Sequence, residues 1–350
     1  MEITKKIIGN LEKCYSLALL HYNDVDYFLV AAEKKNKCLL FDLDGNEITT
    51  VWNEPGGVMS MVQIPESNGE FIAVQKFYSP NDSAEAYLAL VSPNSSGEWT
   101  RRKILDLPFV HRFDILRSGK KNYLIACSLK SAHEYKDDWR SPGKIFVCEL
   151  PKDLSGFNEN HQLQMSCLQD GLLRNHGYYR VVDANGNSSA VVSCANGIFH
   201  VFPPTSENAS WQMKQLTHKS ASDAALVDFQ KNGKKELAVL SPFHGEEFSI
   251  MREIDGVYKT AFTFQKKLPF LHALFAGEIA GKNCVVVGNR EGERDLLLFS
   301  WNAQAQTYEC ETLDTNCGSA NVLHFVKDGI DFIVSANREI NEIALYKITV

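Results

Sequence analysis

The 350-residue chain lacks the features that mark disulfide-rich, secreted or membrane proteins. None of its nine cysteines belongs to a CxxC pair, and their odd number and scattered positions favour reduced thiols over a disulfide framework. No apolar run approaches the roughly 20 residues of a membrane-spanning helix, and no apolar segment of a secretory signal follows the N-terminus. We therefore expect a cytoplasmic protein with no membrane partner.

Clusters of basic residues are also scarce. Lysine and arginine number 36 against 43 acidic residues, which gives a formal net charge of −7, and the densest basic runs are the pairs Lys34–Lys35 and Lys266–Lys267. A protein that binds a nucleic acid neutralises phosphates with clustered cations, so no nucleic-acid partner is expected. A single pocket can still bind an anion, because net charge does not describe one site.

Helical periodicity is hard to find, and the chain instead repeats a short apolar segment that ends in small or polar residues. Successive copies begin 43, 52, 67, 47, 48 and 47 residues apart. The period is therefore about 50 residues and fits seven times into the chain. The seven copies cover residues 28–31, 71–74, 123–126, 190–193, 237–240, 285–288 and 332–335.

Each copy follows a turn rich in Gly, Asn, Asp or Lys, and a further apolar segment precedes that turn, as in a β-hairpin. Two more alternating segments follow, which makes about four strands per repeat. The pattern predicts an all-β protein, a seven-bladed β-propeller of four antiparallel strands per blade, formed by residues 1–350 as one domain. Residues 2–8 are expected to supply the last strand and close the ring. A pair of β-sandwiches is the alternative, but it would not explain a constant period.

Two of the repeats, at residues 181–187 and 227–237, resemble degenerate FG-GAP repeats. Such repeats usually carry an acidic calcium loop. Most of those acids are absent here, so we predict no calcium in these turns.

The rim of the axial pocket can be located from the repeat, because the innermost strand of a blade starts on the face where the second strand ends. Counting back 12 residues from each second strand gives Ser16, Met59, His111, Tyr178, Ala225, Ala273 and Ala320, with His272 beside Ala273 and His176 just before Tyr178. The ends of the second strands contribute polar side chains: Lys76, Lys130, Asn196, His244, Asn289, Arg290, Asn337 and Arg338. The third repeat carries a long insertion over residues 131–140, with His133 and Trp139, and long loops are often functional.

A pocket with a histidine, a tyrosine and cations suits the removal of a proton next to a carbonyl or carboxylate group, followed by loss of a β-oxygen. The candidate catalytic residues are His111, His133 and Tyr178. The candidate substrate-binding residues are Lys76, Lys130, Trp139, His176, Asn196, His244, His272, Asn289, Arg290, Asn337 and Arg338. The alternative for each is structural, since a lone histidine is often a satisfied polar group, and Arg290 and Arg338 could pair with Glu291 and Glu339.

The order of His111, His133 and Tyr178 resembles that of the seven-bladed propeller carbon–oxygen lyases of carbohydrates, which include ulvan lyases, a rhamnose-glucuronate lyase and the propeller of aldos-2-ulose dehydratase. This resemblance implies that the two histidines and the tyrosine lie in the axial cup and perform β-elimination. The arginine of that family is not matched, because Cys194, Ala195 and Asn196 occupy the corresponding segment. Arg290 or Arg338 could replace it from across the cup.

The expected activity is therefore that of a carbon–oxygen lyase on a small keto-sugar, anhydro-sugar or uronate-containing saccharide. The sequence requires no cofactor, and it leaves open a divalent metal ion held by histidines, since no spacing is a strong metal signature. It also leaves the oligomeric state open. The alternative function is a non-catalytic propeller that binds a partner or a carbohydrate. A nucleophilic hydrolase is less favoured, because no GxSxG motif occurs.

Overall fold

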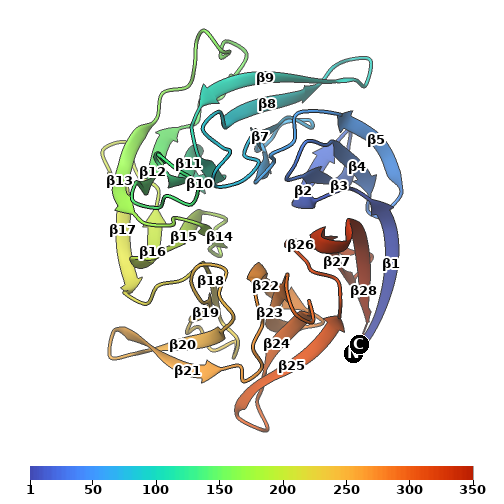
Figure 1. The fold of residues 1–350 in the computed structure, drawn as a ribbon, viewed down its shortest axis with the longest axis vertical. Coiled ribbons are helices and arrows are strands. Elements are labelled where there is room, and N and C mark those ends of the chain that lie inside the picture. Colours follow the sequence, from blue (N-terminus) through green and yellow to red (C-terminus); the bar gives the residue numbers. More distant parts are fainter. Residues whose placement is uncertain (350) are drawn as a thin grey trace.

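The computed structural model describes residues 1–349, which form seven four-stranded antiparallel sheets arranged in a ring. Figure 1 looks along the axis of the ring and shows one strand of each sheet beside the axis and one at the perimeter. This arrangement confirms the predicted seven-bladed β-propeller. Among these residues, the sole helical element is the 3₁₀ turn η1 (Arg338–Ile340), and no helix is long and apolar enough to cross a membrane.

Each blade contains an innermost, a second, a third and an outer strand, counted from the axis. The innermost strands of blades one to seven are β2 (Cys14–Tyr22), β6 (Met61–Gln63), β10 (Val110–Ser118), β14 (Gly177–Val182), β18 (Asp223–Val227), β22 (Leu271–Ile279) and β26 (Asn321–Lys327). The second strands are β3 (Val25–Ala32), β7 (Phe71–Gln75), β11 (Lys121–Lys130), β15 (Ser188–Cys194), β19 (Glu236–Leu240), β23 (Lys282–Asn289) and β27 (Ile330–Asn337). The third strands are β4 (Cys38–Asp42), β8 (Tyr87–Pro93), β12 (Pro142–Glu149), β16 (Gly197–Phe202), β20 (Phe248–Ile254), β24 (Leu296–Asn302) and β28 (Glu342–Thr349). The outer strands are β5 (Glu47–Trp52), β9 (Trp99–Asp106), β13 (Ser166–Leu172), β17 (Gln212–Thr217), β21 (Val257–Thr263), β25 (Thr307–Asp314) and β1 (Glu2–Asn10).

The seven repeated apolar segments all lie in the second strands, as predicted. These strands pack against neighbouring blades on both faces, and for this reason they are apolar at consecutive positions rather than at alternate ones. In β23, for example, Val285, Val286 and Val287 are all fully buried. The hydrophobic core is accordingly divided into clusters between adjacent blades, such as the one that joins Leu116 of blade three to Val192 of blade four.

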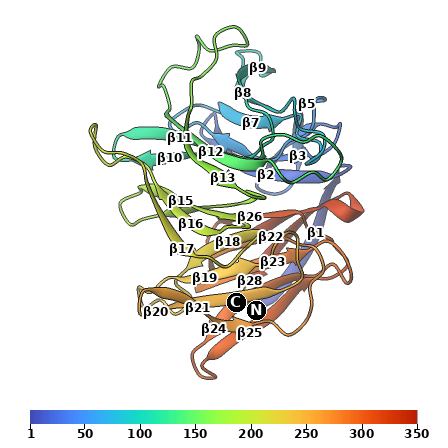
Figure 2. The same cartoon turned by 60° about the vertical axis from the view of Figure 1, so that its left-hand side comes forward.

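The N-terminal strand closes the ring, as the sequence predicts. β1 pairs antiparallel with β28, from Glu2 opposite Thr349 to Asn10 opposite Glu342, and so supplies the outer strand of blade seven. Figures 1 and 2 both show the two ends of the chain side by side at this blade. Lys5 of β1 adds ion pairs to Asp314 of blade six at 2.7 Å and to Glu342 at 2.8 Å.

Three innermost strands begin with a β-bulge, a position where one strand has an extra residue. The pairing with the second strand skips Tyr15 in β2, His111 in β10 and His272 in β22. A bulge interrupts the alternation of side chains between the two faces of a strand. Side chains at consecutive positions, such as His111 and Arg112, can therefore both be directed toward the axis.

Candidate functional site

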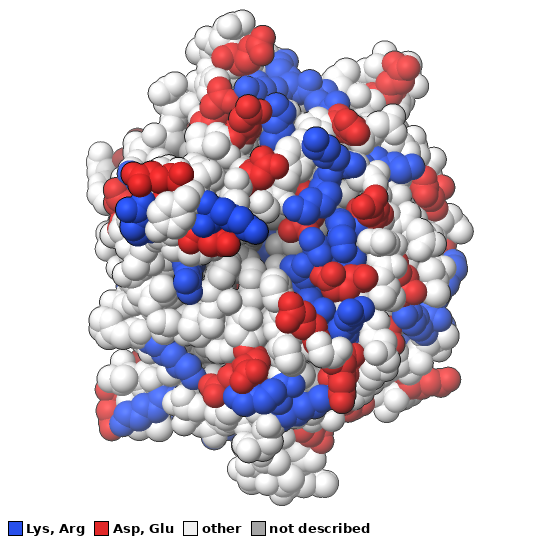
Figure 3. Space-filling view, viewed as in Figure 1, with Lys and Arg blue, Asp and Glu red and all other residues white. Residues whose placement is uncertain are grey.

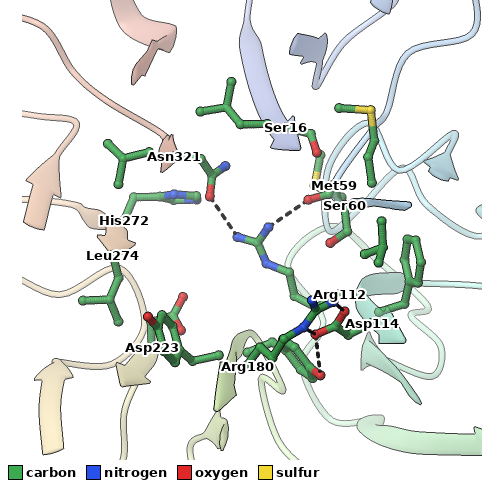
Figure 4. Close-up of a pocket in the computed structure, with 17 residues that line it drawn as sticks. Ser16, Met59, Ser60, Arg112, Asp114, Arg180, Asp223, His272, Leu274 and Asn321 are labelled. Carbon is green, nitrogen blue, oxygen red and sulfur yellow. Dashed lines mark hydrogen bonds and ion pairs between the residues drawn. The ribbon is translucent and has the colours of Figure 1, made fainter. Parts of the chain in front are cut away.

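The innermost strands and the residues just before them enclose a cavity of 260 Å³ on the propeller axis. All seven blades contribute to its wall. In Figure 4 the side chains of Arg112, Asp223, His272 and Asn321 are seen around the same central space. One residue from each blade in turn is Ser16, Ser60, Arg112, Tyr178, Asp223, His272 and Asn321.

Arg112 supplies the positive charge of this cavity. Its guanidinium group donates to the carbonyl oxygen of Met59 at 2.8 Å and to Oδ1 of Asn321 at 3.4 Å, and Figure 4 shows it reaching into the centre. Both acceptors are neutral, and within residues 1–349 Arg112 forms no ion pair with a carboxylate. A half-buried guanidinium that lacks a counter-ion is suited to bind a carboxylate or an oxyanion.

Asp223, the first residue of β18, supplies a carboxyl group to the same wall. It is 6% exposed, and this burial raises the pKa of its carboxyl group to about 7, although Arg112 acts in the opposite direction. Near neutral pH the group is thus divided between its acid and base forms, as a general acid or base requires.

Tyr178 lies on the cavity wall as part of a fixed hydrogen-bonded group. Its hydroxyl donates to Oδ2 of the buried Asp114 at 3.0 Å, and Arg180 donates to the same oxygen at 2.7 Å. Burial, together with the nearby Asp114, raises the pKa of Tyr178 well above its ordinary value of 10. The phenol therefore keeps its proton at neutral pH and holds it in the hydrogen bond to Asp114.

Four histidines pack together at one end of the cavity. The ring centroids of His111 and His176 are 4.4 Å apart, those of His176 and His244 are 4.8 Å apart, and those of His244 and His272 are 5.1 Å apart. His272 also lines the cavity, so this histidine cluster and the Arg112 cavity adjoin.

Backbone carbonyl groups orient three of these rings. Nδ1–H of His111 donates to the carbonyl of His176 at 3.2 Å, that of His176 to Ser222 at 3.0 Å, and that of His272 to Ala320 at 2.6 Å. A carbonyl oxygen can only accept, so Nδ1 must carry the hydrogen in each ring. The Nε2 atoms are then free to accept a hydrogen bond or to bind a cation.

The cluster is held in its neutral form. Burial, followed by the positive charge of Arg112, lowers the pKa of His176 to about 3. Burial also lowers the pKa of His111, His244 and His272 well below the ordinary value of 6.5. Four adjacent imidazoles could not all be charged in this space.

The long insertion of blade three lies beside the same end of the axis. Trp139 packs edge-on against Phe243 with ring centroids 5.1 Å apart, and Phe243 contacts His176 in the same way at 5.3 Å. Lys130 is 1% exposed, lies 4.7 Å from the centre of the Trp139 ring and donates to the carbonyl of Asp138 at 3.2 Å. Five of the expected substrate-binding residues are thus connected near one end of the cavity: His176, His244, His272, Lys130 and Trp139.

His133 occupies a different position in that insertion. Its ring packs against Phe109 with centroids 5.6 Å apart, and its buried Nδ1 has no hydrogen-bond partner among the described residues. Of the three expected catalytic residues, only Tyr178 lines the cavity, while His111 belongs to the histidine cluster.

The other expected binding residues make contacts within the protein. Arg290 and Arg338 both pair with Glu339, at 2.6 and 2.7 Å, and Arg338 also pairs with Glu33. The remaining contacts are those of Lys76 with Glu85, of Asn196 with the amide of Leu173, of Asn289 with the backbone of Pro269, Glu291 and Asp295, and of Asn337 with Glu342. These arginines are neutralised, in contrast to Arg112.

Arg112 and Asp223 were absent from the residues expected to line the pocket. Arg112 follows His111 directly, and simple alternation would place it on the opposite face of the strand. Asp223 lies two residues before the counted position Ala225. Their charge could have identified them in the sequence, because this arginine and this aspartate lie beside rim positions that are otherwise mostly small or apolar.

No family model matches the chain, and neither does any curated protein. Solved structures show the same fold over nearly the whole chain. They include virginiamycin B lyase from Staphylococcus aureus, with a TM-score of 0.59, 11% identity and coverage of 99% of this chain and 100% of the other. The β-propeller domain of Myceliophteria thermophila Cps50 (Swd1) has a TM-score of 0.62, 9% identity and coverage of 99% and 100%. The soluble aldose sugar dehydrogenase from Escherichia coli has a TM-score of 0.52, 12% identity and coverage of 99% of both chains. At these identities the similarity concerns the fold alone.

Proposed function

We propose that the protein is a carbon–oxygen lyase that acts on a small oxygen-rich substrate such as a keto-sugar, an anhydro-sugar or a uronate-containing saccharide. The observation that carries this proposal is the pair of Arg112 and Asp223 in one axial cavity, a cation without a carboxylate partner and a carboxyl group with a pKa of about 7. Lyases exist on this fold, as virginiamycin B lyase shows by name.

The proposed step begins when the Asp223 carboxylate removes the proton next to the carboxylate or carbonyl group of the substrate. The electron pair of that C–H bond moves onto the oxygen, and Arg112 stabilises the resulting oxyanion. The pair then returns to form a C=C bond as the bond between the β-carbon and its oxygen breaks. The departing oxygen takes a proton from the newly protonated Asp223, because Tyr178 donates its own hydrogen to Asp114 and its pKa lies well above 10.

Asp223 suits the role of base better than the histidines expected from the sequence. Burial keeps the pKa of His111 well below 6.5, so this ring is a weak base at neutral pH, whereas a base with a pKa near 7 is matched to that pH. The cavity of 260 Å³ lies just below the roughly 300–1,000 Å³ of common ligand pockets, which favours a substrate of monosaccharide size over a polymer.

The test is a screen of keto-sugars, anhydro-sugars and uronides for a new ultraviolet-absorbing enone or unsaturated uronate. The wild type should form such a product from at least one class. Asp223→Asn and Arg112→Met should each lower kcat/KM about 100-fold or more. The matched controls are Asp255→Asn in an exposed turn and Arg101→Met on the outer strand β9, which should retain full activity.

Two results would refute the lyase assignment: no absorbing product from any class, or full activity in both cavity variants. A non-catalytic carbohydrate-binding role predicts instead that a saccharide binds the wild type without being converted. Binding that is lost in Arg112→Met, with no product formed, would favour that alternative.

A further inference from the structure

Three of the four clustered histidines bring their side-chain nitrogens to one point. His176 precedes β14 in blade four, His244 follows β19 in blade five, and His272 lies at the bulge of β22 in blade six. One nitrogen from each ring lies within 4.8 Å of one nitrogen from each of the other two. Three imidazoles that converge from three blades can supply three of the ligands of one metal ion.

The orientation of two of these rings is the one found in metal ligands. Nδ1–H of His176 donates to the carbonyl of Ser222 and Nδ1–H of His272 to that of Ala320, at 3.0 and 2.6 Å. A metal-binding histidine commonly donates its other ring N–H to a carbonyl or carboxylate, which fixes the ring and leaves the opposite nitrogen free for the ion. Here that free nitrogen is Nε2.

The spacing of two of these nitrogens also suits a metal ion. Nε2 of His176 and Nε2 of His244 are 3.2 Å apart. Two ligands of a tetrahedral zinc ion with Zn–N bonds of about 2.1 Å are separated by about 3.4 Å. Without an ion, the two atoms can share only one hydrogen, donated by His244. Nε2 of His272 accepts a hydrogen bond from the hydroxyl of Tyr15 at 3.1 Å, and a bound ion would replace this bond.

The charges around the histidine cluster affect which further ligand a bound metal ion would take. The guanidinium group of Arg112, which has no carboxylate partner among the described residues, lies near enough to His176 to disfavour a positive charge on it. Neutral imidazole is the form that binds metal ions. Positive surroundings favour an anion or hydroxide as the ligand that completes the sphere.

We propose that His176, His244 and His272 form a binding site for one divalent transition-metal ion, with zinc as the preferred ion and the remaining position open to water or an anionic ligand. A set of three imidazole nitrogens suits zinc, cobalt and copper, and not calcium or magnesium, which require oxygen ligands. This proposal does not depend on the lyase proposal, because neither Arg112 nor Asp223 is a ligand.

The test measures metal binding directly, without a substrate. Full-length protein is freed of metal with a chelator and then titrated with Co²⁺ while visible absorption is recorded, and with Zn²⁺ by calorimetry. The wild type should bind one ion per chain with the visible bands of a tetrahedral nitrogen site. His244→Ala, the variant least prone to misfold because His244 is only half-buried, should weaken binding about 100-fold. His272→Ala should do the same.

The control is His200→Ala, since His200 lies on the third strand β16 and bonds to Ser189, away from the axis. This variant should bind metal like the wild type, and thermal unfolding of the metal-free variants checks that they are folded. The proposal fails if the wild type binds neither ion stoichiometrically at micromolar concentration. It also fails if a folded His244→Ala binds as tightly as the wild type, or if the cobalt spectrum shows charge transfer from a thiolate.

Discussion

At the scale of single residues, Asp223 is a buried carboxyl group whose burial opposes ionisation and brings its pKa close to neutral pH. A carboxyl group that is 6% exposed loses most of its hydration. Its pKa of about 7 means that ionising it requires more free energy in the folded protein than in water. Groups of this kind are concentrated at functional sites, where they are kept for chemistry rather than for stability. Asp223 should therefore carry a cost to stability that a neutral residue of the same shape would not.

The pH dependence of stability tests this cost. Between the unfolded pKa of about 3.9 and the folded pKa of about 7, the folded chain binds more protons than the unfolded chain, so the free energy of unfolding falls as pH rises. Asp223→Asn removes the effect and should stabilise the protein at pH 8 by about 2–4 kcal/mol, with little change at pH 4. Urea unfolding of both proteins at the two pH values measures the difference.

Asp255→Asn is the control for this prediction, because Asp255 is exposed in the turn between β20 and β21. Its unfolding free energy should follow that of the wild type at both pH values. Equal stability of Asp223→Asn and the wild type at pH 8 would contradict the assigned pKa.

At the scale of strands, the bulges explain why the axial residues were only partly predictable. The sequence placed His111, Tyr178 and His272 at the starts of innermost strands, because the repeat gives the position of each strand within a few residues. It did not reveal that the extra residue in β10 would allow Arg112 to join its neighbour at the axis. A bulge depends on how two strands pair, and a period-2 pattern in one strand does not contain that information.

The contact between neighbouring innermost strands depends on Gly177, the first residue of β14. A Cβ atom at this position would lie 2.6 Å from the carbonyl oxygen of Ser222 and 2.7 Å from Cα of Asp223, closer than van der Waals contact allows. Only glycine lets β14 approach β18 so closely, and this approach sets the relative positions of His176 and Asp223.

Gly177→Ala should therefore separate blades four and five. We expect a loss of about 1–3 kcal/mol in the free energy of unfolding, as for other overpacked interiors. Chemical denaturation measures this loss. The matched control is Gly156→Ala, because a Cβ atom there meets no heavy atom within 4 Å. If both variants were as stable as the wild type, the close packing at Gly177 would not be a constraint.

At the scale of the whole molecule, the period of about 50 residues was sufficient to predict the architecture. Each second strand is buried on both sides, so its apolar run is visible in the sequence without knowledge of its neighbours. The closing strand was also predictable, since blade seven has only three strands after residue 320 and residues 2–8 can form a fourth. The ion-pair partners of Arg290 and Arg338 were only partly predictable. Glu339 was a candidate partner from the sequence and does pair with Arg338, but it also pairs with Arg290 of blade six, and Glu33 reaches Arg338 from blade one across the closure of the ring.

The closure of the ring also links distant parts of the chain. Ile3 of β1 packs against a cluster between blades six and seven that contains Tyr346 and the buried Cys317. In the intact ring, β1 covers one side of this cluster. If β1 is removed, β28 becomes an exposed edge strand, and one side of the cluster loses its cover.

A chain that lacks residues 2–10 should therefore unfold at a temperature at least about 5 °C lower, and Cys317 should become reactive. Thiol labelling of the native protein followed by mass spectrometry measures the second effect. In the wild type, Cys167 should be labelled first, because it is exposed. Cys310 is also exposed, but desolvation raises its pKa to about 11, and burial raises the pKa of Cys317 to about 12, so both should react more slowly. In the truncated chain Cys317 should follow closely, while Cys127, fully buried in blade three, should stay protected and so serve as the internal control. Uniform labelling of all buried thiols would mean that the ring unfolds as one unit when it is opened, and unchanged protection of Cys317 would mean that three strands are enough to complete blade seven.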